Sequence, residues 1–144
     1  MRHVGDLLSN KGHAVYSIQP EAKIIEALKE LEDKGIGALL VMEQEALIGI
    51  FSERDYARRV ELKGRQSDRT EISEVMTASP ICVRPDQTID ECMALMTERR
   101  IRHLPVIEDN RVIGVISIGD VVKEVIAEQQ FQIKQLENYI SGTR

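Results

Sequence analysis

The chain has 144 residues with 42% hydrophobic content, which is long enough for one folded unit with a core and too short for several independent ones. Lys and Arg total 19 against 24 Asp and Glu, and the net charge of -5 provides no general attraction to nucleic acid or to an anionic membrane. No apolar run approaches the roughly 18 residues of a membrane span. We therefore expect a soluble cytoplasmic protein, with an organelle as the alternative compartment.

The first half of the chain reads as one β-α-β-β-α unit. An extended piece, AVYSIQP (14–20), ends at a proline that interrupts a strand ladder, and a helix with apolar residues at 24, 28 and 31 follows. GALLVM (37–42) and ALIGIF (46–51) predict two short strands, and the next helix begins at Ser52. The turn residues between these strands, Gln44 and Glu45, are weak ones, so this hairpin is inferred partly from the second half.

The second half has the same order of elements after a polar connector. ICVRP (81–85) precedes a helix with apolar residues at 89, 93 and 96, and HLPVI (103–107) and RVIGVIS (111–117) flank the favourable turn residues Asp109 and Asn110. The last helix begins at Ser117, and its apolar stripe is longer than a core requires, which indicates partner contact. We divide the chain into repeat 1 (1–62), a linker (63–71) and repeat 2 (72–144) with the extended helix.

The two halves are copies of one another. A shift of 65 positions aligns residues 36–55 with 101–120 without a gap, and eight of the aligned pairs are identical. One such unit of about 60 residues buries only some 60% of its unfolded surface and is marginal alone. We therefore expect the two copies to pack sheet against sheet, as one module of the α/β (α+β) class.

The same polar pair follows the last strand of each copy. Ser52 with Asp55, and Ser117 with Asp120, have the spacing of a helix capping box, which by itself explains one isolated occurrence. Recurrence in the same register favours a binding role in addition. A serine hydroxyl can donate to a phosphate oxygen, and an ionised aspartate, which only accepts, can bind both hydroxyls of a ribose.

The doubled pattern resembles a tandem pair of CBS domains, the Bateman module, and is similar to small stand-alone CBS-pair proteins of bacteria and plant organelles. The motifs that carry the resemblance are GALLVMEQEALIGIFSERDYARRV in the first copy and HLPVIEDNRVIGVISIGDVV in the second. The first copy departs from the pattern at Leu40, where the second has Pro105. The resemblance covers nearly the whole chain.

The resemblance implies a ligand, AMP, ADP, ATP or NAD(H), with its ribose on Asp55 or Asp120. It also implies an adenine slot lined by the first strand and the L-P-V strand of each copy, which here are Tyr16, Ile18 and Leu39, and Ile81, Val83, Leu104 and Pro105.

Phosphates require cations, and the family's clefts lie across a pseudo-two-fold. A ligand on Asp55 and Ser52 is then expected to meet Arg102 and His103 of the other copy. A ligand on Asp120 and Ser117 is expected to meet Arg54.

The leading hypothesis is a non-catalytic regulatory module that signals energy or redox state to an unidentified partner protein and forms a homodimer. Two alternatives stay open: a structural dimerisation module with vestigial clefts, and a sensor of S-adenosylmethionine. No nucleophile with a base, carboxylate pair or metal-ligand set is readable, and Cys82 and Cys92 have no zinc-ligand spacing with the histidines. With 3% aromatic residues, stacking on nucleic acid is disfavoured.

Overall fold

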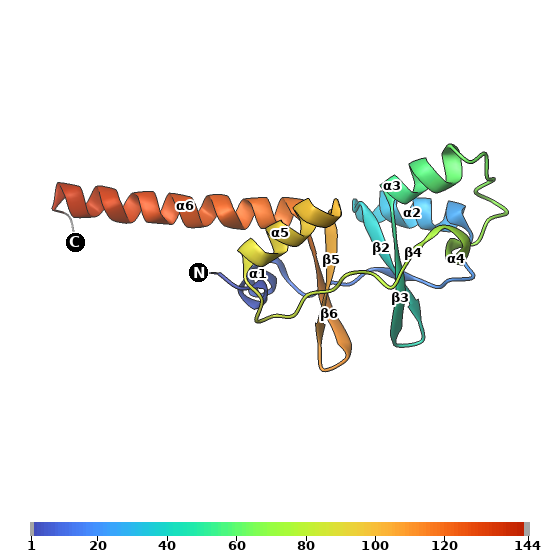
Figure 1. Ribbon diagram of the computed structural model, residues 1–144, viewed down its shortest axis with the longest axis horizontal. Helices are drawn as coiled ribbons and strands as arrows, with labels where there is room; N and C mark the ends of the chain where they lie inside the picture. Colours follow the sequence, from blue (N-terminus) through green and yellow to red (C-terminus); the bar gives the residue numbers. More distant parts are fainter. Residues whose placement is uncertain (1, 143–144) are drawn as a thin grey trace.

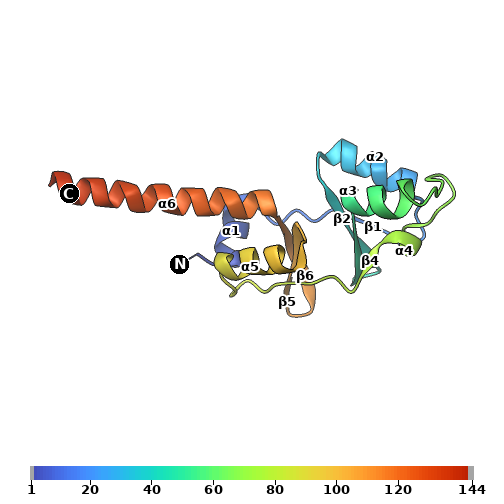
Figure 2. The same cartoon turned by 45° about the horizontal axis from the view of Figure 1, so that its top comes forward.

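Two lobes, each a sheet backed by helices, lie side by side in the computed structural model, which describes residues 2–142 (Figures 1 and 2). The sheets meet in the middle of the module, and the helices of each lobe cover the outer side of its sheet (Figure 1). This arrangement confirms the predicted fold class, with two repeats packed sheet to sheet and a long helix at the C-terminal end.

The first lobe contains a four-stranded sheet in the order β1-β2-β3-β4. Its elements are β1 (Ser17–Ile18), α2 (Ile24–Lys34), β2 (Ala38–Glu43), β3 (Ala46–Ser52), α3 (Glu53–Asp55), the π-helix η1 (Tyr56–Glu61), α4 (Ile72–Val75) and β4 (Thr77–Ala78). The antiparallel pairing of β2 with β3 confirms the hairpin that was predicted partly from the second copy.

The second lobe is built on the hairpin of β5 (His103–Glu108) and β6 (Arg111–Ser117). Its helices are α1 (Val4–Lys11), α5 (Ile89–Arg99) and the start of α6 (Ile118–Ser141). Both Asp109 and Asn110 have positive φ, 52° and 63°, as a two-residue turn matching the strand twist requires. The extended piece equivalent to β1 is reduced here to an isolated parallel bridge between Val83 and Val106.

Each lobe contains one short helix that belongs, in sequence, to the other repeat. α1 lies at the start of repeat 1, yet its Leu7 and Leu8 are buried in the core of the second lobe. α4 comes after the connector, and its Ile72 and Val75 are buried in the core of the first lobe. The divisions at residues 62 and 72 therefore separate the sequence repeats but not the packed lobes. Neither helix was predicted, because each has only one or two turns of apolar pattern.

Side chains alternate between the two faces of each hairpin, and this alternation decides what faces the middle of the module. Leu39 and Leu104 are fully buried in the helix-covered cores of their lobes. Leu40, the next residue along β2, is 1% exposed and is buried toward the neighbouring lobe. The interlobe face is therefore formed by the residues adjacent to the core positions.

The helix α6 runs well beyond the second lobe (Figures 1 and 2). Its exposed apolar side chains are Ile118, Val122, Ile126, Phe131, Ile133, Leu136, Tyr139 and Ile140. Among residues 2–142, no helix combines the length and the apolar character that a membrane crossing needs.

Candidate functional site

The serine and aspartate that follow each last strand form a capping box. The backbone N–H of Ser52 donates to Asp55 Oδ2 at 2.9 Å, and the N–H of Asp55 donates to Ser52 Oγ at 3.2 Å. The corresponding distances between Ser117 and Asp120 are 2.8 and 3.2 Å. One oxygen of each carboxylate is therefore fixed by the backbone, which aims the other oxygen in a defined direction.

The remaining oxygen of Asp55 faces a cavity of ≈ 290 Å³ between the lobes, here named the Asp55 cavity. Asp55 Oδ1 accepts from the Thr77 hydroxyl at 3.2 Å and lies 3.8 Å from Arg59 Nε. The lining residues are Ile50, Ser52, Glu53, Arg54, Asp55, Arg58, Arg59 and Thr77 with Gly37 from the first lobe, and Arg100, Ile101, Arg102 and His103 from the second. The structure thus brings Asp55 and Ser52 together with Arg102 and His103.

A second cavity of ≈ 380 Å³ holds Asp120 and Ser117 and is named the Asp120 cavity. It is lined by Lys11, Ala14, His103, Val115, Ser117 and Asp120, and from the first copy by Tyr16, Gly35, Ile36, Gly37, Ala38 and Leu40. The two cavities are related by the 65-residue shift, because Ile50 corresponds to Val115 and Arg102 corresponds to Gly37. Each cavity combines the aspartate of one copy with the segment before the first hairpin strand of the other.

The two cavities differ strongly in charge. Where the Asp55 cavity has Arg100, Arg102 and His103, the Asp120 cavity has Gly35, Gly37 and Ala38 at the corresponding positions. The Asp55 cavity is therefore the one suited to a phosphate.

Lys11 supplies the cation of the Asp120 cavity. Its Nζ lies 2.6 Å from Asp120 Oδ2 and donates to the Val115 carbonyl, also at 2.6 Å. Burial alone would raise the pKa of Asp120, but hydrogen bonds from Lys11 and from the Ser117 backbone outweigh it and hold the pKa below the ordinary aspartate value. The Asp120 carboxylate is thus ionised and already partnered.

His103 lies between the lobes and lines both cavities. Burial lowers the pKa of His103, and the positive charge of Lys11 lowers it further, against an opposing effect of Asp120. The imidazole is therefore neutral at pH 7 until an anion beside it favours its protonation.

Most of the adenine-pocket residues predicted from the resemblance lie away from the two cavities. Within residues 2–142, of the seven only Tyr16 lines one of the two cavities, the Asp120 cavity. Leu39, Val83 and Leu104 are core residues, Ile18 and Ile81 pack against the cores, and Pro105 is buried without lining either cavity. For Leu39 and Leu104 the placement follows from strand parity, since the apolar cavity positions Leu40, Ile50 and Val115 point to the opposite face. Ile81 and Pro105 are equivalent to Tyr16 and Leu40, so parity does not account for them.

Arg54 is also placed differently from the prediction. It lines the Asp55 cavity and is not among the residues around Asp120. Its Nη1 donates to the backbone carbonyl of Arg100 at 2.7 Å, across the gap between the lobes. Because Arg54 immediately precedes Asp55 at the start of the same helix, its side chain crosses to the second lobe beside Asp55, and the crossed pairing with Asp120 is not carried forward.

The residues that sequence reasoning missed are Lys11, Leu40, Ile50, Thr77, Arg100 and Val115. Lys11 and Thr77 lie just before the first extended piece of each copy, in segments for which no helix or strand was predicted. A strict count of alternating positions along the strands would have identified Leu40, Ile50 and Val115, since their neighbours Leu39, Phe51 and Ile116 are the core residues. Among residues 2–142 there is no group of three or more His, Cys, Asp or Glu side chains that could hold a metal ion.

The fold and the paired cavities define a pseudo-symmetric module of two α/β repeats with ligand-sized clefts between them. The family model of the CBS domain matches twice, at residues 4–62 and 72–127, so the chain belongs to the CBS-domain family and contains a tandem pair. CBS pairs are regulatory modules.

Known CBS-domain proteins are similar to this chain over most of its length. The mitochondrial CBS domain-containing protein CBSX3 of Arabidopsis thaliana is 37% identical over 148 residues, spanning 96% of this chain and 72% of that protein. A putative signal-transduction protein with CBS domains from Burkholderia ambifaria has a TM-score of 0.85 at 48% identity, covering 88% of this chain and 96% of that one. The CBS domain pair of MJ0100, solved with 5-methylthioadenosine and S-adenosyl-L-methionine, has a TM-score of 0.78 at 24% identity, covering 89% and 98%.

Proposed function

We propose that this protein is a non-catalytic regulatory module that binds an adenine nucleotide across its two lobes, with the ribose on Asp55. The observation that carries the proposal is the composition of the Asp55 cavity: Asp55 and Ser52 from one copy face Arg102 and His103 from the other. An ionised carboxylate accepts from vicinal hydroxyls, and the facing cations neutralise a phosphate. The side chain of Asp55 is 13% exposed, so such bonds form largely away from competing water.

The apolar part of the cavity suits a base. Ile50 and Ile101 lie on opposite lobes and present aliphatic surface on either side. A flat heterocycle placed there would bury its faces while the sugar and phosphate reach the polar end. The Asp120 cavity, with Tyr16, Leu40 and Val115, is proposed as a second nucleoside site whose carboxylate must first exchange Lys11 for the ribose.

Binding across the lobes provides a means of signalling. A ligand that contacts both lobes has differential affinity for states in which the lobes are closer or farther apart, and it shifts the population between them by that difference. We propose that AMP, ADP, ATP or NAD(H) acts in this way and that a partner protein responds to the change.

The projecting part of α6 is proposed as the homodimer contact. Residues 122, 126, 129, 133, 136 and 140 are spaced alternately by four and three, which is the repeat of a coiled-coil seam. Ile126, Ile133 and Ile140 occupy one seam position, with Val122, Gln129 and Leu136 at the other; isoleucine at the first position beside leucine at the second, as at Ile133 and Leu136, favours two strands. Light scattering should show a dimer for the native chain and a monomer for a variant with both Ile133→Asp and Leu136→Asp.

One alternative ligand class has a specific observation in its favour. The MJ0100 pair was solved with 5-methylthioadenosine and S-adenosyl-L-methionine, which contain adenosine but no phosphate. These ligands give the arginines of the Asp55 cavity no phosphate to neutralise, and only S-adenosyl-L-methionine offers a carboxylate, so the charge of this cavity favours nucleotides.

A thermal-shift screen of AMP, ADP, ATP, NADH and S-adenosylmethionine tests the proposal. A ligand at 100 times its dissociation constant adds about 2.7 kcal/mol to the free energy of unfolding. For a chain of this size the melting temperature should rise by roughly 5 to 10 °C. Asp55→Ala should remove the part of the AMP shift that comes from the Asp55 cavity, whereas Asp86→Ala, which removes an exposed carboxylate outside the cavities, should leave the shift unchanged. If no adenine nucleotide shifts the transition, the vestigial-cleft alternative is favoured.

A further inference from the structure

A third cavity, lined by four arginines and no carboxylate, adjoins the Asp55 cavity. Its volume is ≈ 470 Å³, and we name it the arginine cavity. The lining residues are Arg54, Ala57, Arg58, Met96, Thr97, Arg100, Ile101, Arg102 and Ile118. The chain as a whole has a net charge of -5, but all the charged residues that line this cavity are positive.

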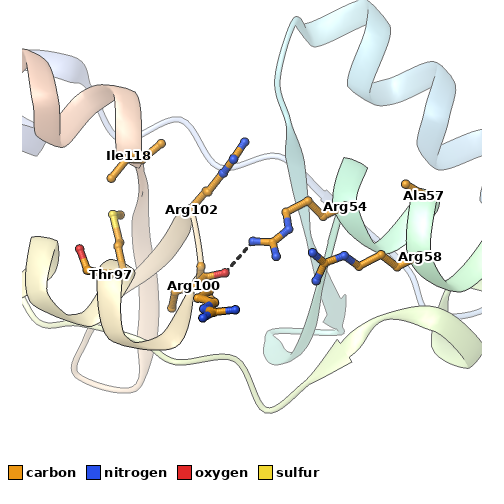
Figure 3. Close-up of a pocket in the computed structure, with 9 residues that line it drawn as sticks. Arg54, Ala57, Arg58, Thr97, Arg100, Arg102 and Ile118 are labelled. Carbon is orange, nitrogen blue, oxygen red and sulfur yellow. Dashed lines mark hydrogen bonds between the residues drawn. The ribbon is translucent and has the colours of Figure 1, made fainter.

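The four arginines approach the cavity from both lobes. Figure 3 shows Arg54 and Arg58 reaching from α3 and η1 toward the second lobe, while Arg100 and Arg102 stand on the opposite side. Arg54 is fixed by its hydrogen bond to the carbonyl of Arg100. The guanidinium groups of Arg58, Arg100 and Arg102 have no hydrogen bond or ion pair with any residue in the range 2–142.

The four arginines concentrate positive charge in a cavity that has no carboxylate in its lining. Like charges held in one cavity repel each other, and a guanidinium is matched geometrically by a phosphate or carboxylate that accepts two of its N–H groups. Arg58, Arg100 and Arg102 are exposed, and all three line the same cavity, so an anion with several oxygens can pair with more than one of them at once. Arginines dispersed over a solvated surface would not share a cavity from two different lobes.

The arginine cavity is continuous with the Asp55 cavity. Arg54, Arg58, Arg100, Ile101 and Arg102 line both. A ligand with its ribose on Asp55 and its first phosphate near Ser52 therefore has a path along these shared residues for any further phosphates. The equivalent positions around Asp120 are Gly119, Lys123, Gly35 and Gly37, which provide one cation in place of four.

We propose that the arginine cavity is a polyphosphate subsite, so that the Asp55 cavity selects ligands with phosphoryl groups beyond the first. This inference rests on the proposed nucleotide function for its nucleoside part. The chemistry that the arginines recognise is a chain of phosphates, and this comes either from a nucleoside triphosphate or from free inorganic polyphosphate.

Calorimetric titrations with AMP, ATP and inorganic tripolyphosphate test the subsite. They use the full chain in magnesium-free buffer at constant ionic strength, because binding of exposed charges depends on salt. The native protein should bind ATP at least about tenfold more tightly than AMP, the size of one charge-assisted hydrogen bond. In Arg58→Gln/Arg100→Gln the preference should fall below about threefold, because the affinity for ATP falls more than the affinity for AMP.

Two features of the chain make this variant interpretable. Arg100 has φ 54°, and the chain already places a glutamine, Gln44, at φ 57°, so Arg100→Gln introduces no new backbone demand. Arg69→Gln/Arg99→Gln removes the same charge from exposed positions outside the three cavities and should retain the tenfold preference.

The outcomes separate this inference from the proposed function. If AMP binds and is lost in Asp55→Ala but ATP binds no more tightly than AMP, the subsite is overturned and the nucleotide function stands. The subsite is also overturned if the control variant loses the preference equally. If AMP does not bind, while tripolyphosphate binds the native protein and not Arg58→Gln/Arg100→Gln, the arginine cavity is a site for free polyphosphate and the nucleotide function fails.

Discussion

Lys11 and Asp120 join the first helix of the chain to the second ligand cavity, and their pairing can be measured. We expect Lys11→Met to remove both the ion pair with Asp120 and the hydrogen bond to the Val115 carbonyl, each 2.6 Å long. Methionine keeps the length of the side chain, so the packing of α1 on the second lobe is retained.

The magnitude follows from distance, exposure and entropy. At an effective dielectric constant of 20, two unit charges in contact attract by about 4 kcal/mol or more. Against this stand the desolvation of both groups and about 1.5 to 2 kcal/mol of side-chain entropy for an ordered lysine. Because the Lys11 side chain is 38% exposed and the Asp120 side chain 20%, solvent screening reduces the net coupling to about 1 kcal/mol.

A double-mutant cycle in urea at pH 7 provides the assay. It compares the native chain with Lys11→Met, Asp120→Asn and the double variant, and the interaction energy should be about 1 kcal/mol. Lys11→Met should lower the free energy of unfolding by about 1 to 2 kcal/mol in total. For 144 residues the entropy of unfolding is near 0.3 kcal/mol/K, so the melting temperature should fall by about 3 to 7 °C. Effects that add within about 0.3 kcal/mol would refute the reasoning.

The chain offers a matched control pair. Arg84 and Asp86 also form an ion pair, at 3.2 Å, but their side chains are 67% and 77% exposed, so a cycle with Arg84→Met and Asp86→Asn should show coupling near zero. The pKa provides a second readout. Hydrogen bonds from Lys11 lower the pKa of Asp120, so the ionised carboxylate stabilises the folded state above the ordinary aspartate value of 3.8, and this stabilisation is lost as the pH falls through the folded-state pKa. Lys11→Met should raise the folded-state pKa of Asp120.

Three further outcomes are expected. Gly114→Ala should lower the melting temperature by about 3 to 10 °C, because the new Cβ would lie 2.7 Å from Leu8 Cδ2 and overpacking costs about 1 to 3 kcal/mol; an unchanged transition would contradict the packing of α1 on the second lobe. Burial lowers the pKa of His103, so the native chain should lose stability relative to His103→Gln as the pH falls below the ordinary value of 6.5, and parallel pH profiles would count against this. Burial raises the pKa of Cys92 to about 11, so this thiol should react with a thiol reagent at pH 8 only after unfolding; rapid reaction in the folded chain would disprove its burial.

The repeat made most of the fold predictable. Two aligned copies at a fixed shift identified both hairpins, and the weak turn at Gln44 was recovered because its counterpart at Asp109 and Asn110 has strong turn chemistry. The capping boxes at Ser52 and Ser117 were also predictable, because a cap is a local interaction between residues three apart.

What the sequence did not predict depends on contacts between distant segments. The packing of α1 in the second lobe joins Leu8 to Gly114, residues separated by more than 100 positions, and no local pattern encodes it. The same is true of Lys11, whose role at Asp120 follows from that packing. The direction of Arg54 across the interlobe gap likewise depends on where the end of α5 lies.

The placement of Leu39 and Leu104 outside the cavities has a local cause. The motif L-P-V marks the strand, but the side chains of a strand alternate, and the most hydrophobic positions of the motif are the core positions. Leu39 and Leu104 were taken from the L-P-V strand that the resemblance indicates, whereas the cavities are lined by neighbouring residues of the pleat, such as Leu40.

The central claim is that one nucleotide is held by both copies at the Asp55 cavity, and a crystal structure of the AMP complex tests it most directly. The account predicts ribose hydroxyls within hydrogen-bonding distance of the Asp55 carboxylate and a phosphate that faces Ser52 on one lobe and Arg102 and His103 on the other. A nucleotide bound by residues of one lobe alone, or with its ribose away from Asp55, would contradict it.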